Sequence, residues 1–262
     1  MVARHDHPSR EQTILNRMTA ATQVLHRHPD TFMELADLGT RIPAYRPTFS
    51  FPNGHINASH RFFSMCPVKD EHLIQMLDRR WWARPIRGWL RREDALKLYE
   101  MAYFASGDIL ELGSYQGLST CVLSQANRDS SARKTITSVD LDPRSVRLAR
   151  RNLRSLGLAL GVEILCDDAF QLVSRLAAEE KRFGFVFVDH SHHYEPMLAV
   201  CRGLAGVVAP SGFCLFHDFN DVRNRDPQNQ DYRVYQAVKE GLDMDSFEFY
   251  GIYGCTALYR RR

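Results

Sequence analysis

Short apolar runs that alternate with amphipathic segments limit the folds open to this chain more than any other feature of its sequence. Beyond residue 91, five such runs occur at 108–113, 135–140, 162–167, 183–189 and 212–218. The segments between them carry apolar residues at helical spacing and begin near Gly117, Pro143, Ala169 and His193. Strands that are apolar along their whole length and alternate with helices are typical of a parallel sheet covered on both faces.

Two further apolar runs close the chain, at 247–254 and 255–260, after a helix candidate at 231–242. They adjoin through a turn that contains a glycine, which predicts a terminal hairpin and therefore one antiparallel strand. We expect an α/β domain with a doubly wound, mostly parallel sheet over residues 91–262. Residues 1–90 read as an extension of helical and irregular character, in the role of a lid, an acceptor wall or an oligomer contact.

Composition and charge argue against a nucleic acid or a membrane as partner and against a disulfide or zinc framework. The chain has 262 residues and a formal net charge of +3, which gives no reason to expect a nucleic acid or an anionic membrane as partner. We find no signal peptide and no continuous apolar span, and we expect a cytoplasmic protein. The six cysteines form no CxxC pair and stand mostly in apolar runs, as small core residues do in a reducing compartment.

Carboxylates follow or end five strand candidates in succession. Ligands of doubly wound sheets lie outside the carboxyl ends of the strands, where the strand order reverses. Aspartate also caps helices, which explains one or two such acids but not five in succession. We therefore expect a binding site formed by the acids at these ends: Glu111, Asp140 with Asp142, Asp167 with Asp168, Asp189 and Asp218.

The first of these ends reads ELGSYQG, with Gly113 and Gly117 separated by three residues. A dinucleotide-binding turn needs a middle glycine for the pyrophosphate, and this loop lacks it. A carboxylate at the mouth of the loop repels phosphate and suits a cationic ligand, such as a sulfonium nucleoside with an amino group. Asp140 is placed to accept from ribose hydroxyls, and Asp168 with Ala169 from an adenine amino group. The missing middle glycine and the carboxylate of Glu111 also disfavour an NAD-dependent oxidoreductase.

The ordered motifs ELGSYQGLST, SVDLD, CDDA, FVFVDHSHHYE and GFCLFHD resemble the class I S-adenosylmethionine-dependent methyltransferases. More narrowly, they are similar to the methyltransferase-24 branch of small O-methyltransferases, which includes metal-dependent enzymes that act on sugars and natural products. The resemblance covers residues 88–262 and implies a Rossmann-like sheet of seven strands whose last strand is reversed. It also implies S-adenosyl-L-methionine as cofactor, with contacts at Glu111, Gly113, Ser114, Tyr115, Gly117, Ser119, Asp140, Leu141, Asp168 and Ala169.

The same resemblance implies the reacting groups. In VDHSHHYEP, Asp189 matches a ligand of a divalent metal and His192 matches the catalytic base. In FHDFND, Asp218 matches a second ligand, and His217 stands where the family commonly has an acid. Oxygen ligands alone suit Mg²⁺, whereas an imidazole shifts the preference toward Mn²⁺ and other transition metals. His192 as a solvated loop residue and His217 as a buried, hydrogen-bonded histidine remain alternatives, and Asn220 or Asp221 remain substitutes for the third ligand.

The expected activity is methyl transfer from S-adenosyl-L-methionine to a hydroxyl of a small molecule, a sugar or a phenolic metabolite, with metal assistance. A metal-independent N- or O-methyltransferase is the alternative within the same class, and a non-catalytic scaffold is the alternative outside it. The polar loop at 223–235, with Arg223, Arg225 and Gln228, is expected to bind the acceptor. Phe49, Phe51, Phe62, Trp81 and Trp82 are expected to form the opposite wall, and a homo-oligomer is left open.

Overall fold

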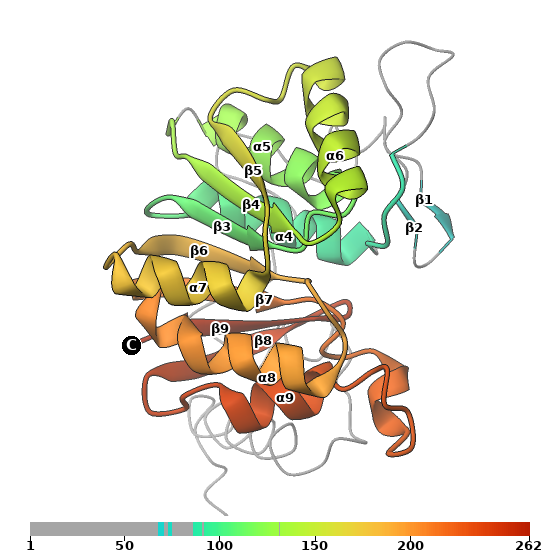
Figure 1. The fold of residues 1–262 in the computed structure, drawn as a ribbon, viewed down its shortest axis with the longest axis vertical. Helices are drawn as coiled ribbons and strands as arrows, with labels where there is room; N and C mark the ends of the chain where they lie inside the picture. Colours follow the sequence, from blue (N-terminus) through green and yellow to red (C-terminus); the bar gives the residue numbers. More distant parts are fainter. Residues whose placement is uncertain (1–67, 71–72, 75–85, 91, 131) are drawn as a thin grey trace, which may run out of the picture.

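The computed structural model describes residues 68–70, 73–74, 86–90, 92–130 and 132–262 (Figure 1). The predicted extension 1–90 therefore lies largely outside the described residues, together with the five aromatic residues expected to form a wall. Its described parts are a two-stranded antiparallel sheet, β1 (Val68–Asp70) with β2 (Leu73–Ile74), and the segment 86–90. The predicted roles of the extension stay predictions.

A seven-stranded sheet in the order β5-β4-β3-β6-β7-β9-β8 forms the centre of the described domain. The strands β3 to β7 pair in parallel, and β9 is antiparallel to both of its neighbours. This order confirms the doubly wound fold and the terminal hairpin. From β3 the chain adds β4 and β5 on one side of the sheet, and it then returns to add β6 and β7 on the other, so the strand order reverses between β3 and β6. The strands are β3 (Ile109–Leu112), β4 (Ile136–Asp140), β5 (Val162–Cys166), β6 (Phe183–Val188), β7 (Val208–Phe216), β8 (Phe247–Tyr253) and β9 (Thr256–Arg261).

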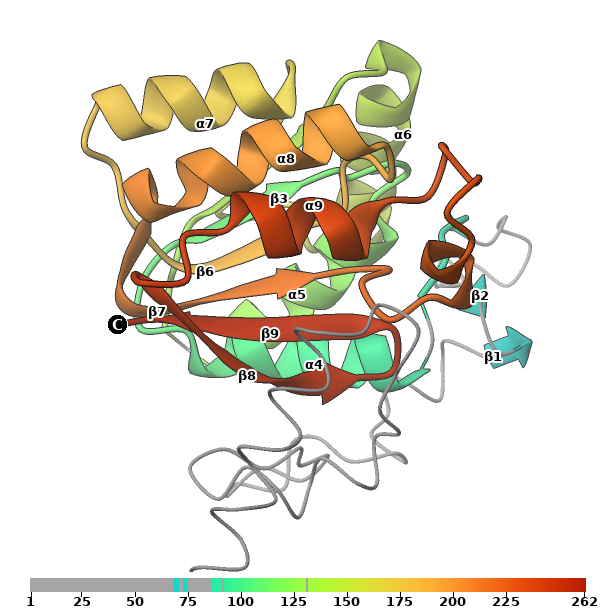
Figure 2. The ribbon, with the colours of Figure 1, turned by 90° about the horizontal axis from the view of Figure 1, so that it is seen from below.

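Six α-helices cover the two faces of this sheet in the described ranges, with α7, α8 and α9 on one face and α4 and α5 on the other (Figure 2). Because side chains alternate along a strand, Val186 and Val188 of β6 pack in the cluster of α7–α9, whereas Phe185 and Phe187 pack in the cluster of α4–α6. The helices are α4 (Arg92–Phe104), α5 (Leu118–Ser130), α6 (Pro143–Leu156), α7 (Ala169–Ala178), α8 (Tyr194–Gly203) and α9 (Val234–Gly241), with short 3₁₀ turns η1 (Leu204–Gly206) and η2 (Val222–Arg225).

Helix α6 shows how local sequence sets the boundaries of an element. The Asp142 carboxylate accepts from the backbone N–H groups of Arg144 and Ser145, at 3.0 Å each, and Pro143 occupies the first helical position as predicted. Gly157 ends the helix in the left-handed conformation, at φ 69°. None of the helices in the described ranges combines the length and apolar character needed to cross a bilayer.

Strand β7 differs from its predicted range, because it begins at Val208 and not at residue 212. Val208 pairs with Phe183, and an irregularity in the β6–β7 register then precedes the pairing of Phe213 with Phe185. Ser211 has a positive φ of 62° at this irregularity. Pro210 and Gly212 in this stretch argue against a continuous strand in the sequence, and the register shift is what accommodates them.

Candidate active site

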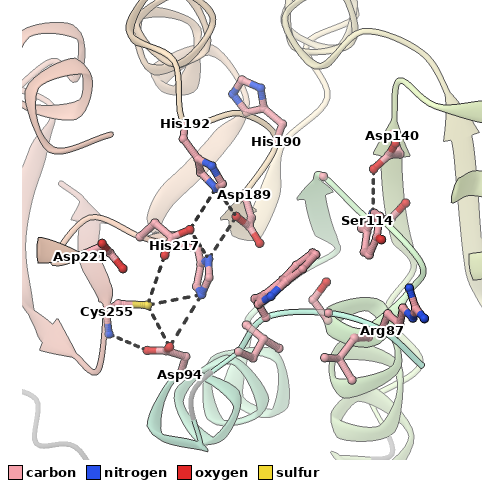
Figure 3. Close-up of a pocket in the computed structure, with 18 of the residues that line it drawn as sticks. Arg87, Asp94, Ser114, Asp140, Asp189, His190, His192, His217, Asp221 and Cys255 are labelled. Atoms are coloured by element: carbon pink, nitrogen blue, oxygen red, sulfur yellow. Dashed lines mark hydrogen bonds and ion pairs between the residues drawn. The ribbon is translucent and has the colours of Figure 1, made fainter. Parts of the chain in front are cut away.

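A cavity of about 450 Å³ lies at the carboxyl ends of the central strands, where the strand order reverses (Figure 3). Two groups of predicted residues line it. The loop after β3, the first turn of α5 and the end of β4 contribute Gly113, Ser114, Tyr115, Ser119 and Asp140. The ends of β6 and β7 contribute Asp189, His190, His192, His217 and Asp218. The fold therefore joins the predicted cofactor loop and the predicted reacting groups in one space.

The loop after β3 owes its path to Gly113 and Asp140. Gly113 has φ 103°, and a Cβ atom at this position would lie 2.1 Å from the carbonyl oxygen of Asp189, so only glycine fits. Asp140 accepts from the backbone N–H of Tyr115 at 2.7 Å and from that of Asp142 at 2.9 Å. Tyr115 is held at φ 41° and its ring faces Trp89, with 5.6 Å between the ring centroids.

Glu111 lies within β3, not at its end as expected, and its side chain is completely buried. Its Oε2 atom accepts from Thr120 Oγ1 at 2.6 Å and from Ser138 Oγ at 2.5 Å, so Thr120 bonds here and does not cap α5. Burial raises the pKa of this carboxyl to about 7. Within the described part of the chain, Glu111 Oε1 and the buried Ser114 Oγ have no hydrogen-bond partner, and of these two atoms only Ser114 Oγ belongs to a residue that lines the cavity and could meet a ligand.

Five of the ten predicted cofactor contacts do not line the cavity, and the fully buried Glu111 is the first of them. Gly117 packs against α6, where a Cβ atom would lie 3.0 Å from Ala149 Cα. Leu141 is 71% exposed. Asp168 caps α7 by accepting from the backbone N–H of Gln171 at 3.0 Å, and Ala169 is the buried first residue of that helix. Gly117, Asp168 and Ala169 thus have structural roles, and a ligand contact at each of the five residues stays a prediction.

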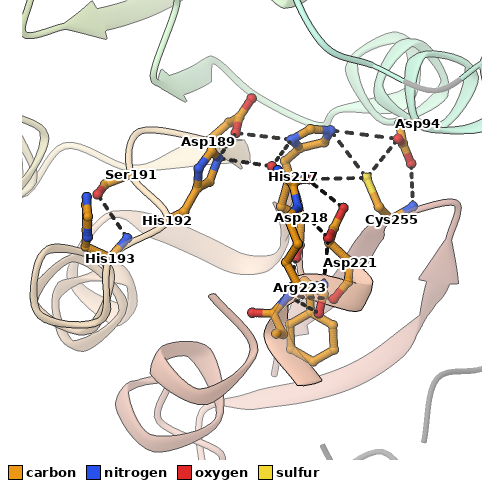
Figure 4. Close-up of polar contacts among 12 residues, drawn as sticks. Asp94, Asp189, Ser191, His192, His193, His217, Asp218, Asp221, Arg223 and Cys255 are labelled. Atoms are coloured by element: carbon orange, nitrogen blue, oxygen red, sulfur yellow. Dashed lines mark hydrogen bonds and ion pairs between the residues drawn. The ribbon is translucent and has the colours of Figure 1, made fainter. Parts of the chain in front are cut away.

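The predicted metal ligands and base form one connected cluster (Figure 4). His217 Nδ1 lies 3.1 Å from Asp189 Oδ1 and 3.2 Å from Asp218 Oδ2. His192 Nε2 lies 3.0 Å from Asp218 Oδ2 and 3.9 Å from Asp189 Oδ1. Asp218 has φ 57°, so a non-glycine residue is held in the left-handed region where β7 has ended. The cluster gathers two carboxylates and two imidazoles at one cavity wall.

Electrostatics in this cluster favours ion pairs. Burial lowers the pKa of His192, but hydrogen bonds to Asp189 and Asp218 outweigh it and raise that pKa to about 9. Burial likewise lowers the pKa of His217, but Asp189, Cys255 and Asp218 together outweigh this effect and raise that pKa. His190, which also lines the cavity, has a pKa of about 4 because burial disfavours its charged form. Two of the three histidines therefore interact strongly with acids, and His190 does not.

Two groups of residues in the described ranges bring three metal-ligating atoms within 4.8 Å of one another: Asp189 with His217 and Asp218, and Asp94 with His217 and Cys255. The first group is the metal set implied by the sequence. His217 is 4% exposed and is hydrogen-bonded, so the structure also agrees with its alternative as a buried histidine.

The second group was missed, and Cys255 is more than the small core residue expected. Its backbone N–H donates to Asp94 Oδ1 at 2.8 Å, and its Sγ donates to Asp94 Oδ2 at 3.0 Å. The Sγ atom also lies 3.4 Å from His217 Nε2. The available signal was an acid, Asp94, one helical turn from the apolar Leu98 in α4, since a buried acid on an apolar face needs a polar partner.

The outer wall of the cavity comes from segment 86–90 and from the region after β7. Arg87 and Trp89 line it from the first segment. Arg223 donates to both oxygens of Asp221, at 2.8 and 3.0 Å, and its guanidinium lies 3.7 Å from the Tyr232 ring centroid. Tyr232 in turn lies 4.4 Å from the ring of His192. Of the loop residues predicted to bind an acceptor, Arg223 lines the cavity, whereas Arg225 and Gln228 are exposed and do not line it.

The part of the chain that runs from β3 to the end of β7 matches a known family. Residues 110–219 match the family model described as a methyltransferase domain. The O-methyltransferase imqG of Aspergillus flavus is 32% identical to this chain over 161 residues, which cover 53% of this chain and 64% of that protein. This chain therefore spans less than two thirds of the length of that curated relative.

Solved structures share the fold at low sequence identity. An O-methyltransferase from Bacillus cereus in complex with SAH is 16% identical, with a TM-score of 0.57 over 66% of this chain and 82% of that one. The O-methyltransferase TomG from Streptomyces achromogenes in complex with SAM is 17% identical, with a TM-score of 0.54 over 66% and 81%. At such identities the likeness concerns the fold alone. Together with the family match, it supports the predicted resemblance: residues 110–219 match a methyltransferase domain, and the sheet has the fold of the solved O-methyltransferases.

Proposed function

We propose that this protein transfers a methyl group from S-adenosyl-L-methionine to a hydroxyl of a small molecule, with assistance from a divalent metal ion. One observation carries the proposal. A single cavity joins the loop after β3, with its unpartnered buried Ser114 Oγ, to the cluster of Asp189, His192, His217 and Asp218. The curated relative is an O-methyltransferase and supports the same reaction class.

The donor side of the cavity fits a cationic nucleoside. Ser114 Oγ is a buried polar atom that lines this side and has no partner in the described ranges, so a ligand amino group would find an acceptor there. Asp140 lines the same side and retains lone pairs for ribose hydroxyls beyond the two backbone bonds it already accepts. When bound, S-adenosyl-L-methionine supplies an electrophilic methyl group on a sulfonium.

The acceptor side fits a divalent ion of octahedral preference. Asp189 Oδ1 and Asp218 Oδ2 lie 3.1 and 3.2 Å from His217 Nδ1. Neighbouring ligands in an octahedral shell with bonds of about 2.1 Å are separated by about 3.0 Å, close to both distances. When bound, a divalent ion lowers the pKa of a coordinated hydroxyl and orients it. The mixed oxygen and nitrogen set favours Mn²⁺ over Mg²⁺.

His192 is the proposed base because it borders this set and the cavity. Its Nε2 atom lies 3.0 Å from Asp218, and the Tyr232 ring packs 4.4 Å from the imidazole on another side. These contacts fix the ring with Nε2 toward the acids. Because Asp189 and Asp218 raise the pKa of His192 to about 9, the neutral form that can accept a proton becomes abundant only at alkaline pH in the metal-free protein. A divalent ion held by the same two acids would lower this pKa, and neutral Nε2 could then accept the proton of the acceptor hydroxyl.

A small, hydroxylated acceptor fits the remaining walls. The cavity volume of about 450 Å³ must hold both the donor and the acceptor, which limits the acceptor to a compact molecule. Trp89 and Tyr232 supply aromatic faces, and Arg87 and Arg223 supply hydrogen-bond donors. A sugar or a phenolic metabolite has the matching combination of apolar faces and hydroxyls.

Calorimetric titration with S-adenosylhomocysteine, beside NAD⁺, tests the proposal. We expect micromolar binding of the nucleoside and none of NAD⁺. An acceptor screen with S-adenosyl-L-methionine then follows with Mn²⁺, with Mg²⁺ and with a chelator. Activity that survives the chelator would establish the metal-independent alternative, and a chain that binds neither ligand would contradict the proposed function.

A further inference from the structure

We propose that Asp94, His217 and Cys255 form a second metal site, which takes a soft divalent ion such as Zn²⁺. The three residues come from α4, from the residue after β7 and from the turn between β8 and β9 (Figures 3 and 4). This site differs from the set of Asp189, His217 and Asp218 because it offers a sulfur ligand, although both sets include His217. Its existence does not depend on methyl transfer.

The distances among the three ligand atoms agree with one small ion. Cys255 Sγ lies 3.0 Å from Asp94 Oδ2 and 3.4 Å from His217 Nε2, and these last two atoms are 3.7 Å apart. Around tetrahedral Zn²⁺, with bonds of about 2.0–2.3 Å, such atoms are separated by about 3.4–3.6 Å. Adjustments of a few tenths of an ångström therefore complete the site.

The donor atoms select a different kind of ion from the first set. A thiolate prefers Zn²⁺ and other soft or borderline ions, whereas Mg²⁺ takes oxygen ligands almost alone. All three side chains are buried, with Asp94 0%, Cys255 2% and His217 4% exposed. Nevertheless, each of them lines the cavity, so an ion can reach the site and a water can occupy its fourth position.

The surroundings hold the thiol in place. The backbone N–H of Cys255 donates to Asp94 Oδ1 at 2.8 Å, which leaves Oδ2 of the same carboxylate toward the sulfur and His217. A metal at this point replaces the proton between Sγ and Oδ2 and retains the backbone bond. The arrangement thus offers one oxygen, one nitrogen and one sulfur without a rearrangement of the chain.

His217 belongs both to this thiol site and to the catalytic metal set proposed above, so the expected inhibition by Zn²⁺ rests on that proposed set. A neutral imidazole has one lone pair in the ring plane. An ion on Nε2 leaves the proton on Nδ1, the atom that faces Asp189 and Asp218. Occupation of the thiol site therefore removes the nitrogen ligand from the proposed catalytic set, and Zn²⁺ is expected to inhibit the Mn²⁺-assisted reaction.

Titration of the metal-free full chain with Co²⁺ tests the site, because a thiolate bound to Co²⁺ gives a charge-transfer absorption in the near ultraviolet. We expect this absorption in the wild type and its loss when Zn²⁺ displaces Co²⁺. The absorption should disappear in Cys255→Ser, and the affinity for Zn²⁺ should fall at least about tenfold. Cys166→Ser is the matched control, since that cysteine is exposed and remote from the set.

The wild-type spectrum decides the matter even if Cys255→Ser does not fold. A wild type without the absorption, or an absorption that persists in a folded Cys255→Ser, would overturn the proposed site. Asp189→Asn should retain the absorption, which separates this site from the proposed catalytic set. Titration with S-adenosylhomocysteine in the same samples reports the cofactor site independently, so failure of one proposal leaves the other measurable.

Discussion

The Nδ1 atom of His217 lies 3.1 Å from the Oδ1 atom of Asp189, across the ends of the neighbouring strands β6 and β7. The backbone fixes this relationship, because His217 N donates to the carbonyl of Val188 at 3.1 Å and Asp189 N donates to that of Leu112 at 2.8 Å. Both side chains are thus placed by sheet hydrogen bonds. A site on such elements is more rigid than one on loops, which favours metal binding.

Replacement of Asp189 by asparagine should weaken binding of Mn²⁺ by at least about tenfold, because the proposed set loses one charged oxygen ligand. The affinity for S-adenosylhomocysteine should change little, since Asp189 lies on the acceptor side of the cavity. Calorimetry with each ligand measures both effects. Equal affinity for Mn²⁺ in the wild type and the variant would exclude Asp189 as a ligand.

His192→Ala should lower the rate of methyl transfer by about 10²–10⁴-fold, the range typical of a lost general base. His193→Ala is its control, because this neighbour is exposed and its nearest acid, Asp231, lies 3.8 Å away. Initial rates at saturating donor measure the difference. If both variants lose activity equally, the loss reflects damage to the loop and not a missing base.

Asp140→Ala should reduce the affinity for S-adenosylhomocysteine by about tenfold or more, because it removes the proposed ribose acceptor and the bond that holds Tyr115 N. Asp142→Ala supplies the comparison, since Asp142 caps α6 through Ser145 N. That change should lower the folding stability through loss of the cap and leave the affinity unaltered. Equal losses of affinity in the two variants would point to a general disturbance of this corner.

The sequence predicted the sheet and the strand-end acids well because both follow from local patterns. Asp189 and Asp218 stand directly beyond apolar runs, and parallel strands bring their carboxyl ends to one edge. Asp168 shows the limit of that argument, since an acid after a strand also caps the next helix, as it does here. The pattern alone does not separate capping from ligand binding.

The contacts that depend on distant segments were not predictable in the same way. Asp94 and Cys255 are separated by 161 positions and meet because α4 lies beside the turn between β8 and β9. Glu111 was expected at the end of a strand. Instead its buried carboxylate accepts hydrogen bonds from Thr120 of α5 and Ser138 of β4. In both cases the packing of whole elements decides the environment of one polar side chain.

Gly113→Ala should destabilise the protein by about 3 kcal/mol, because φ 103° disfavours a side chain and the new Cβ atom would lie 2.1 Å from the carbonyl oxygen of Asp189. Gly157→Ala is the matched variant: its φ of 69° is also positive, but nothing lies within 4 Å of the added atom. It should cost about 1 kcal/mol. Urea denaturation measures both, and equal costs would show that the loop shifts without penalty.

Glu111→Gln should flatten the dependence of stability on pH. Burial raises the pKa of the native carboxyl from 4.5 to about 7, so the native state binds more protons than the unfolded chain between these values. The free energy of unfolding therefore falls as pH rises through this window, by about 3 kcal/mol in total. Urea denaturation from pH 5 to pH 7.5 should show this loss in the wild type and not in the variant, whereas Glu163→Gln, at an exposed position, should retain it. Identical slopes in the wild type and Glu111→Gln would mean that Glu111 ionises as readily as in the unfolded chain, and its buried, half-partnered carboxylate would then need a cation already bound beside it.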